Sequence, residues 1–211
     1  MVYRISWTLV RLALRTFFGF RIEGNHHEPV AGPLLIVSNH VSDLDPLVVA
    51  VAFRRRVRFM AKIELFRVPL LRWWIIACGA FPVHRGQPDR QAFRTARSIL
   101  ERGGALVMFP EGTRGSSLHD LRPPESGAAL LALRTGATIL PVAVIGTDRV
   151  LPRGARGLAR GRILVRVGAP IRVAGATAPA ATGRADRDRI DTIGRQFMSV
   201  IAGLLDGAAR A

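Results

Sequence analysis

The chain of 211 residues has one cysteine, one lysine and only 15 acidic residues against 31 basic ones. The lone Cys78 cannot form an internal disulfide or a cysteine-based metal cage, which excludes a disulfide-stapled secreted module and favours a reducing compartment. No run of about 18 uncharged apolar residues occurs, so we expect no membrane-spanning helix. The length suits one domain, and the content of 49% apolar and 22% charged residues excludes a disordered, collagen-like or coiled-coil protein.

The excess of basic residues gives a formal net charge of +16, spread along the whole chain rather than gathered in one tail. Such a charge favours polyanionic partners: nucleic acid, anionic lipid or phosphorylated small molecules. A non-enzymatic nucleic-acid-binding protein would need a recognition helix or an aromatic platform, and the sequence offers neither, so no nucleic acid is expected. The arginine-rich stretches 54–58 and 149–172 fit solvated surface or contact with anionic phosphates.

Residues 1–20 predict an amphipathic helix at a membrane interface. Its polar stripe has spacings of four, three and four residues, which place all its members on one side of a helix: Arg4, Thr8, Arg11 and Arg15. Arg11 and Arg15 interrupt the apolar core that a signal peptide needs, and no small-residue cleavage site follows, so we expect the segment to stay on the chain. A helix docked on the protein's own core fits the same pattern.

After residue 30, short β-like runs alternate with helical stretches. This alternation predicts an α/β fold class: a single domain with a mixed, largely parallel central sheet flanked by helices, plus the amphipathic N-terminal helix. The expected strands are 34–38, 57–61, 80–84, 105–109, 139–144 and 163–167, and the expected helices are 46–53, 88–102 and 127–135. The chain should divide into the helix 1–20, an α/β core over 21–173, a flexible linker over 174–189 and a C-terminal helix over 190–211.

Polar residues crowd at the end of the first expected strand, where α/β folds keep their ligand sites. His40 and Asp45 are five residues apart and would point about 140° apart on one continuous helix. They can meet only if His40 lies on the loop and Asp45 at the start of the next helix, a break that Pro46 favours. The pair could act as a general base on an alcohol, or could be a helix cap beside an ordinary loop histidine.

Two further strand ends carry charged residues. The run from Glu111 to Arg114 holds a carboxylate, a guanidinium whose planar fork matches phosphate oxygens, and Gly112, which lets the backbone approach a ligand closely. A structural ion pair between Glu111 and Arg114 is the alternative. The run from Gly79 also ends on a cation, Arg85. Together the three strand ends predict a site for a phosphorylated substrate.

From about residue 20 to residue 172 the sequence resembles the lysophosphatidate acyltransferases, which belong to the wider glycerolipid acyltransferase group. The family's four motifs occur in order: Asn-His-x-Ser-x-x-Asp as Asn39, His40, Ser42 and Asp45; Gly-x-x-x-x-x-Arg as Gly79 to Arg85; Phe-Pro-Glu-Gly-Thr-Arg as Phe109 to Arg114; and a Val/Leu-Pro-Val strand as Leu140-Pro141-Val142. The resemblance therefore rests on the order and spacing of four segments.

The resemblance implies a 1-acylglycerol-3-phosphate O-acyltransferase. Such an enzyme moves a fatty acyl group from acyl-CoA or acyl-carrier protein to the free sn-2 hydroxyl of 1-acylglycerol 3-phosphate and gives phosphatidic acid. His40 would be the general base, supported by Asp45, with no acyl-enzyme, metal or cofactor. The implied phosphate-binding residues are Lys62, Arg85 and Arg114, and the implied site-shaping residues are Asn39, Ser42, Glu111, Gly112 and Thr113.

The implied partners are the lysophospholipid acceptor, the thioester donor and a membrane surface, with the protein peripheral (monotopic) on the cytoplasmic face of the cell membrane. The same core chemistry fits other acceptors: glycerol 3-phosphate, a lyso-ornithine lipid or a glycolipid. A Ser-His-Asp hydrolase is disfavoured because the sequence has no Gly-x-Ser-x-Gly elbow. The adjacent His26 and His27 lack a third ligand at helical spacing, so we expect no metal site there.

Overall fold

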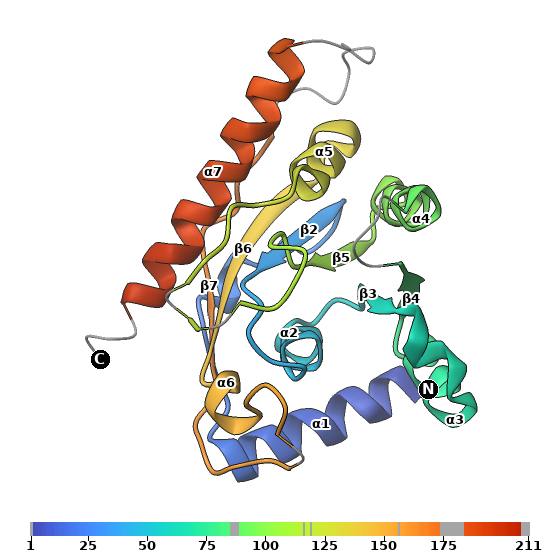
Figure 1. The fold of residues 1–211 in the computed structure, drawn as a ribbon, viewed down its shortest axis with the longest axis vertical. Coiled ribbons are helices and arrows are strands. Elements are labelled where there is room, and N and C mark those ends of the chain that lie inside the picture. The colour runs from blue at the N-terminus through green and yellow to red at the C-terminus, as the bar shows by residue number, and fades with distance from the viewer. Residues whose placement is uncertain are drawn as a thin grey trace.

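The computed structural model describes residues 2–84, 89–115, 117–118, 120–155, 157–173 and 184–207. Within these ranges the helices are α1 (Val2–Phe18), α2 (Asp45–Ala52), α3 (Pro69–Ala77), α4 (Arg90–Glu101), α5 (Ser126–Thr135), α6 (Thr147–Val150) and α7 (Arg184–Asp206), with short 3-10 helices η1 (Asn25–His27) and η2 (Ile63–Arg67). The strands are β1 (Arg21–Glu23), β2 (Leu34–Ser38), β3 (Val57–Lys62), β4 (Ala80–Val83), β5 (Ala105–Met108), β6 (Thr138–Ile145) and β7 (Leu164–Val167). Figure 1 shows their arrangement.

The strands form one seven-stranded sheet in the order β1-β7-β6-β2-β5-β3-β4. The neighbours from β6 to β4 are all parallel, whereas β7 runs antiparallel to β6 and β1 runs parallel to β7. The predicted fold class, a single α/β domain with a mixed, largely parallel sheet and an N-terminal helix, is confirmed. Because five adjacent strands run in the same direction, the residues that follow β2, β3 and β5 meet at one edge of the sheet.

Helices cover both faces of the sheet, and the strand sequences show why. Along β2, Leu34 and Ile36 belong to the cluster under α1 and α2, and Leu35 and Val37 belong to the cluster under α4, α5 and α7. All five residues of β2 are buried, as expected for a central parallel strand that reads as a continuous apolar run. This rigid strand ends at Asn39 and His40.

Several elements differ from the sequence-based expectation. The C-terminal helix begins at Arg184, so the predicted linker is wrong over residues 184–189, and its remainder, 174–183, lies outside the described residues. The charged residues within 184–189 form the first turns of this helix. Basic and acidic residues recur there at helical spacing, and these turns have no apolar face that would have indicated a helix. β1, α3 and α6 were not predicted because β1 and α6 are very short and α3 is apolar on nearly all sides.

One face of α1 is docked on the core. The indole N–H of Trp7 donates to the carbonyl oxygen of Phe53 at 3.0 Å, and the Arg11 guanidinium donates to that of Val51 at 2.9 Å. Leu14 is buried in the core cluster beneath the helix. The opposite face leaves apolar side chains exposed: Ile5, Leu9, Leu12 and Phe17. The docked helix therefore keeps an apolar surface of its own.

The arginine cluster at 54–58 serves the fold in part. The Arg55 guanidinium donates to the carbonyl oxygens of Pro29, Gly32 and Gly103, and so ties two loops to the strand that follows. The carboxylate of Glu28 accepts from the backbone N–H groups of Arg54 and Arg55. In the part of the chain that the structure describes, no helix is long and apolar enough to cross a membrane.

Candidate functional site

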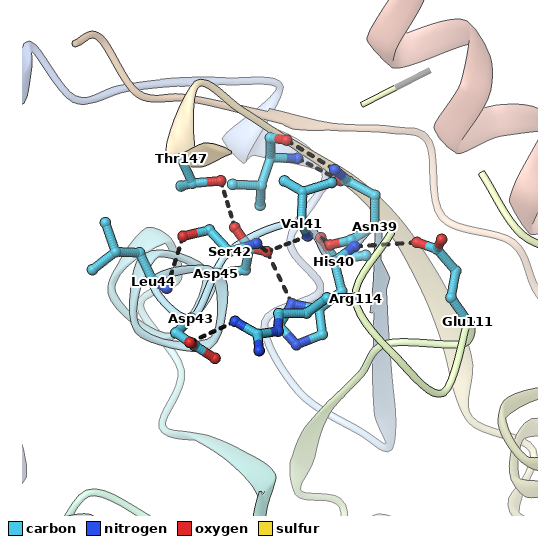
Figure 2. A network of polar contacts seen from close by, with 12 residues as sticks. Asn39, His40, Val41, Ser42, Asp43, Leu44, Asp45, Glu111, Arg114 and Thr147 are labelled. Carbon is cyan, nitrogen blue, oxygen red and sulfur yellow. Dashed lines mark hydrogen bonds and ion pairs between the residues drawn. The ribbon is translucent and has the colours of Figure 1, made fainter. Parts of the chain in front are cut away.

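The site is built around His40 and Asp45, at the junction between β2 and α2. His40 follows the buried strand β2, and Asp45 is the first residue of α2, with Pro46 next in the helix. The Nδ1 atom of His40 lies 2.9 Å from Oδ2 of Asp45, and both side chains are buried (Figure 2). His40 thus lies before α2 and Asp45 at its start, which is the condition under which the two residues were expected to meet.

The Asp45 carboxylate also accepts from the backbone around it. Its Oδ2 atom accepts the N–H groups of Val41 and Ser42, each at 2.7 Å, in addition to its contact with His40. An oxygen surrounded by donors is an acceptor, so the hydrogen between the two side chains belongs to Nδ1 of His40. The other ring nitrogen, Nε2, has no protein partner among the described residues, and the imidazole faces a cavity.

Thr147 is a member of this network that the sequence analysis missed. Its hydroxyl donates to Oδ1 of Asp45 at 2.6 Å, across 102 residues of sequence (Figure 2). Thr147 follows Gly146 at the end of β6, next to β2 in the sheet. The signal available in the sequence was a polar Gly-Thr-Asp run directly after a buried strand, the same pattern that marked His40.

Asn39 and Ser42 hold the backbone of the site. The Asn39 amide pairs with both polar groups of Val144 in β6: its Nδ2 donates to the carbonyl oxygen at 2.9 Å, and its Oδ1 accepts the N–H at 2.8 Å. The Ser42 hydroxyl donates to the carbonyl oxygen of Leu151 and accepts the N–H of Leu44. These contacts fix the turn that carries His40 against β6 and the segment after α6.

The loop after β5 packs directly against His40. The ring of Phe109 stacks on the imidazole with centroids 4.2 Å apart, and the N–H of Gly115 donates to the carbonyl oxygen of His40 at 2.8 Å. Gly112 has a positive φ of 68°, and a Cβ atom there would overlap the carboxylate of Glu125. Glycine at this position therefore permits the turn that brings the loop to His40. The neighbouring Thr113 is exposed.

Glu111 bridges this loop and the His40 backbone. Its carboxylate oxygens accept the N–H of His40 and the N–H of Arg122, each at 3.2 Å. Burial raises the pKa of the Glu111 carboxyl, and these two N–H donors partly offset the increase because they favour the ionised form. The alternative interpretation, an ion pair between Glu111 and Arg114, is not what the structure has: Arg114 pairs with Asp43, and Glu111 accepts from backbone N–H groups.

Arg114 and Lys62 reach the same cavity as His40. Nη1 of Arg114 lies 2.6 Å from Oδ2 of Asp43, a carboxylate that is 70% exposed (Figure 2). Lys62 is the last residue of β3 and is exposed at the cavity wall. Arg85, the third predicted phosphate-binding residue, lies outside the described residues. The structure thus brings together two of the three predicted cations.

The cavity has a volume of about 560 Å³ and a lining of polar and apolar side chains. His40, Asp43, Lys62 and Arg114 line one part of it, and the remainder is lined mostly by apolar and aromatic side chains of α1, α2, β3 and α3. The Trp74 indole N–H donates to the Ser6 hydroxyl at 3.1 Å and links α3 to α1 across the cavity wall. The size and the mixed lining of the cavity suit a ligand with an apolar body and a small polar end.

The residues of the suspected histidine cluster have other partners. The Nδ1 atom of His27 lies 3.0 Å from the carbonyl oxygen of Val167, and Glu28 binds the backbone of the arginine cluster. Among the residues that the structure places, no group of three His, Cys, Asp or Glu side chains is arranged to hold a metal ion.

A mixed α/β sheet carries a His–Asp pair at the end of a parallel strand, beside a cavity with both cationic and apolar lining, and this arrangement suits acid–base chemistry on a bound ligand. The family model described as Acyltransferase matches residues 19–145, and the chain belongs to this family. The match confirms the resemblance that the four motifs indicated. It covers all four motifs, from Asn39 to Val142.

Two relatives found by sequence are named as 1-acyl-sn-glycerol-3-phosphate acyltransferases. The chain is 29% identical over 164 residues to the chloroplastic 1-acyl-sn-glycerol-3-phosphate acyltransferase LPAT1 of Arabidopsis thaliana, covering 76% of this chain and 46% of that protein. It is 36% identical over 140 residues to the 1-acyl-sn-glycerol-3-phosphate acyltransferase of Streptococcus pneumoniae, covering 65% and 49%. The chain thus spans about half the length of these two relatives.

A solved structure shares the fold. The crystal structure of the 1-acyl-sn-glycerophosphate (LPA) acyltransferase PlsC from Thermotoga maritima superposes with a TM-score of 0.79 at 21% identity, covering 99% of this chain and 80% of that one. At this identity the likeness establishes the fold, including the sheet that positions His40.

Proposed function

We propose that the chain is a 1-acyl-sn-glycerol-3-phosphate acyltransferase that converts 1-acylglycerol 3-phosphate to phosphatidic acid. The observation that carries the proposal is the buried His40–Asp45 pair beside a largely apolar cavity whose lining also includes Lys62 and Arg114. Membership of the acyltransferase family and the names of the relatives support the same reaction.

His40 acts as the general base in this proposal. Its Nδ1–H is held by Asp45, so Nε2 presents a lone pair to the sn-2 hydroxyl of the acceptor. As Nε2 takes the hydroxyl proton, the alcohol oxygen attacks the carbonyl carbon of the donor thioester. The tetrahedral intermediate then expels the thiolate, which takes the proton back from Nε2. The carboxylate of Asp45, in contact with Nδ1, supports the positive charge that develops on the imidazole.

The cations and the apolar wall of the cavity bind different parts of the lipid. Arg114, Lys62 and Arg85 bind the acceptor phosphate, where a guanidinium offers a planar pair of donors and Lys62 a point charge. Asp43 shares Arg114 and competes with a phosphate for it. The apolar part of the cavity takes an acyl chain. Holding alcohol and thioester together can supply on the order of 7–11 kcal/mol of barrier reduction, more than the base alone.

The proposed location is a membrane surface, peripherally and on the cytoplasmic side. The outward apolar face of α1 lies beside its stripe of basic residues, the pattern of a helix in the headgroup region. The same helix lines the cavity with Tyr3, Trp7 and Val10. A lipid substrate would therefore meet the cavity close to the bilayer. The donor is acyl-CoA or acyl-carrier protein, and the experiment below distinguishes them.

The test is a mass-resolved product assay on the purified full chain with lysophosphatidate and a mixture of acyl-CoA and acyl-carrier-protein donors. We expect phosphatidic acid from the unchanged protein, and we expect His40→Ala to lower its formation by at least about 100-fold, because general-base help is worth roughly 10²–10⁴. His26→Ala is the matched control, since His26 is exposed on η1 and lies outside the cavity lining.

Equal product formation by His40→Ala and the unchanged protein would refute the mechanism. An acylated product formed only from glycerol 3-phosphate, a lyso-ornithine lipid or a glycolipid would replace the acceptor and leave the transfer chemistry in place. Circular dichroism of His40→Ala checks that the loss of activity is not a loss of fold.

A further inference from the structure

Exposed apolar side chains gather on two segments of the described chain. Nine of the eleven large hydrophobic residues that are exposed lie on α1 or on residues 65–76, the other two being Val30 and Leu158. The first group is the outward face of α1 named above. The second consists of Leu65, Val68, Leu70, Trp73 and Ile76, which we call the α3 outer face. Soluble surfaces scatter such residues singly, so a cluster of this kind marks a contact surface.

Apart from Leu65, which also lines the cavity, the α3 outer face is distinct from the side of α3 that lines the cavity. Leu70, Trp73 and Ile76 recur every three residues and are 79%, 60% and 46% exposed. Their neighbours Leu71 and Trp74 turn the other way and line the cavity. The short helix α3 is therefore apolar on its inner and outer sides, a pattern of helices that are covered on both sides.

The charged residues that line the groove on this surface are both arginines, and the exposed Glu64 directly precedes Leu65. The groove has a volume of about 460 Å³ and is lined by Phe66, Pro69, Trp73 and Ile76 together with Arg67 and Arg72. No acidic residue occurs between residues 65 and 84. An apolar groove edged by two arginines complements an anionic phospholipid, which offers acyl chains to the groove and a phosphate to the guanidinium groups.

The position of this surface favours a bilayer over a protein partner. α1 and α3 flank the same cavity and are joined by the hydrogen bond between Trp74 and Ser6. Figure 1 shows α3 beside the N-terminal end of α1. A bilayer contacts two adjacent apolar surfaces at once, and Trp73 is of the type enriched at the membrane–water interface.

We propose that the α3 outer face is a second bilayer-contact surface, separate from that of α1, which binds anionic phospholipid through Trp73, Leu70 and the arginines beside them. The inference rests on the proposed function only in taking the substrate to be a membrane lipid. Two contacts, on the two helices that line the cavity, hold the cavity in a fixed orientation toward the bilayer, which one helix alone would not do.

The test measures co-sedimentation of the full chain with vesicles of phosphatidylcholine and phosphatidylglycerol. We expect Leu70→Glu/Trp73→Glu to weaken binding by at least about tenfold. The substitutions remove two apolar side chains that would insert into the bilayer, and they add two carboxylates that the anionic lipid repels. Val30→Glu is the matched control: Val30 is 94% exposed and lies away from both segments. Equal binding by the double variant and the control would overturn the proposal.

Quenching of tryptophan fluorescence locates the contact without the introduction of charged residues. Brominated phosphatidylcholine in the vesicles should quench part of the tryptophan emission. Trp73→Phe should remove most of that quenching, because Trp73 is 60% exposed, whereas the indoles of Trp7 and Trp74 line the cavity and are hydrogen-bonded to Phe53 and Ser6. Quenching that is unchanged in Trp73→Phe would place the bilayer elsewhere. Loss of a dimer on gel filtration of the double variant, with vesicle binding intact, would instead assign the surface to a second copy of the chain.

Activity separates this inference from the proposed function. On a short-chain, fully dispersed lysophosphatidate, the double variant should match the unchanged protein, and on vesicle-borne acceptor it should be slower. Absence of acyl transfer by the unchanged protein would refute the proposed function, while the vesicle-binding difference would still establish the surface. Equal loss on both forms of acceptor would show that the substitutions disturb the site and would overturn the surface as a separate element.

Discussion

The carboxylate of Asp45 accepts hydrogen bonds from His40, Val41, Ser42 and Thr147, and only the last can be removed by a side-chain substitution outside the dyad. Thr147→Val has a similar shape without the hydroxyl. We expect kcat to fall about 10-fold to 100-fold, in line with roughly 1.5–3 kcal/mol for a hydrogen bond to a charged group. KM for the acceptor should change little, because Thr147 does not line the cavity.

Thr147→Ser is the control for this positioning role, because it keeps the hydroxyl. It should restore most of kcat, and the pH profile of kcat should shift in Thr147→Val but not in Thr147→Ser. A loss of the same size in both variants, or a rise in KM at constant kcat, would contradict the prediction and leave Thr147 as a packing residue.

Substitutions of Arg114 and of Asp43 should change KM for lysophosphatidate in opposite directions. Arg114→Ala should raise KM for lysophosphatidate by about tenfold or more, since it removes a charged hydrogen-bond donor from the proposed phosphate site. Asp43→Asn should lower KM, because it frees Arg114 from an exposed competitor at 2.6 Å. Steady-state kinetics measure both. Arg97→Ala is the control: Arg97 pairs with Glu101 on α4. Shifts in the same direction would refute the competition.

Among the elements, α1 has two faces with different roles: one packs on the core and the other is exposed. Leu14→Ala should lower the free energy of unfolding by about 2–5 kcal/mol, because Leu14 is buried in the core cluster. Leu9→Ser/Leu12→Ser should change it by no more than about 0.5 kcal/mol, since both side chains are exposed, and should weaken vesicle binding.

Urea denaturation gives the free energy of unfolding of Leu14→Ala and of Leu9→Ser/Leu12→Ser, and co-sedimentation gives the vesicle binding of the same two variants. The prediction for α1 is contradicted if the outer substitutions destabilise the fold as much as Leu14→Ala, or if Leu14→Ala alone abolishes vesicle binding while its fold is intact. Either result would mean that the two faces of the helix are not independent.

For the whole molecule, the net charge of +16 should make association with anionic vesicles depend on salt. Each basic residue near an anionic surface contributes about 1 kcal/mol, and salt screens this attraction. Binding should therefore weaken from about 0.05 to about 0.5 M NaCl, whereas binding to phosphatidylcholine alone should change little. Co-sedimentation measures both series.

Two outcomes would contradict this view of the whole molecule. Salt-independent binding to anionic vesicles would show that the charge does not contribute. Steeply salt-dependent binding to double-stranded DNA, with no consumption of acyl donor, would instead favour the nucleic-acid-binding alternative, which rests on the charge alone.

Much of the fold was predictable because the information is local. The strand β2 reads as a continuous apolar run, and Leu34–Ser38 was predicted with the bounds that the structure has. The meeting of His40 and Asp45 was also predictable, because only five residues separate them and Pro46 marks the start of a helix. Elements without such a pattern, β1 and α3, were missed, and the start of α7 was placed too late.

The amino-acid sequence by itself determined the α/β class, the central strands and the His–Asp pair, because apolar periodicity and short spacings act between near neighbours in the chain. Only the tertiary structure decided which distant groups surround that pair: Thr147 on Asp45, Asp43 beside Arg114, and the cavity between α1 and α3. The order of strands in the sheet and the packing of helices set these contacts, and neither is encoded in any one segment.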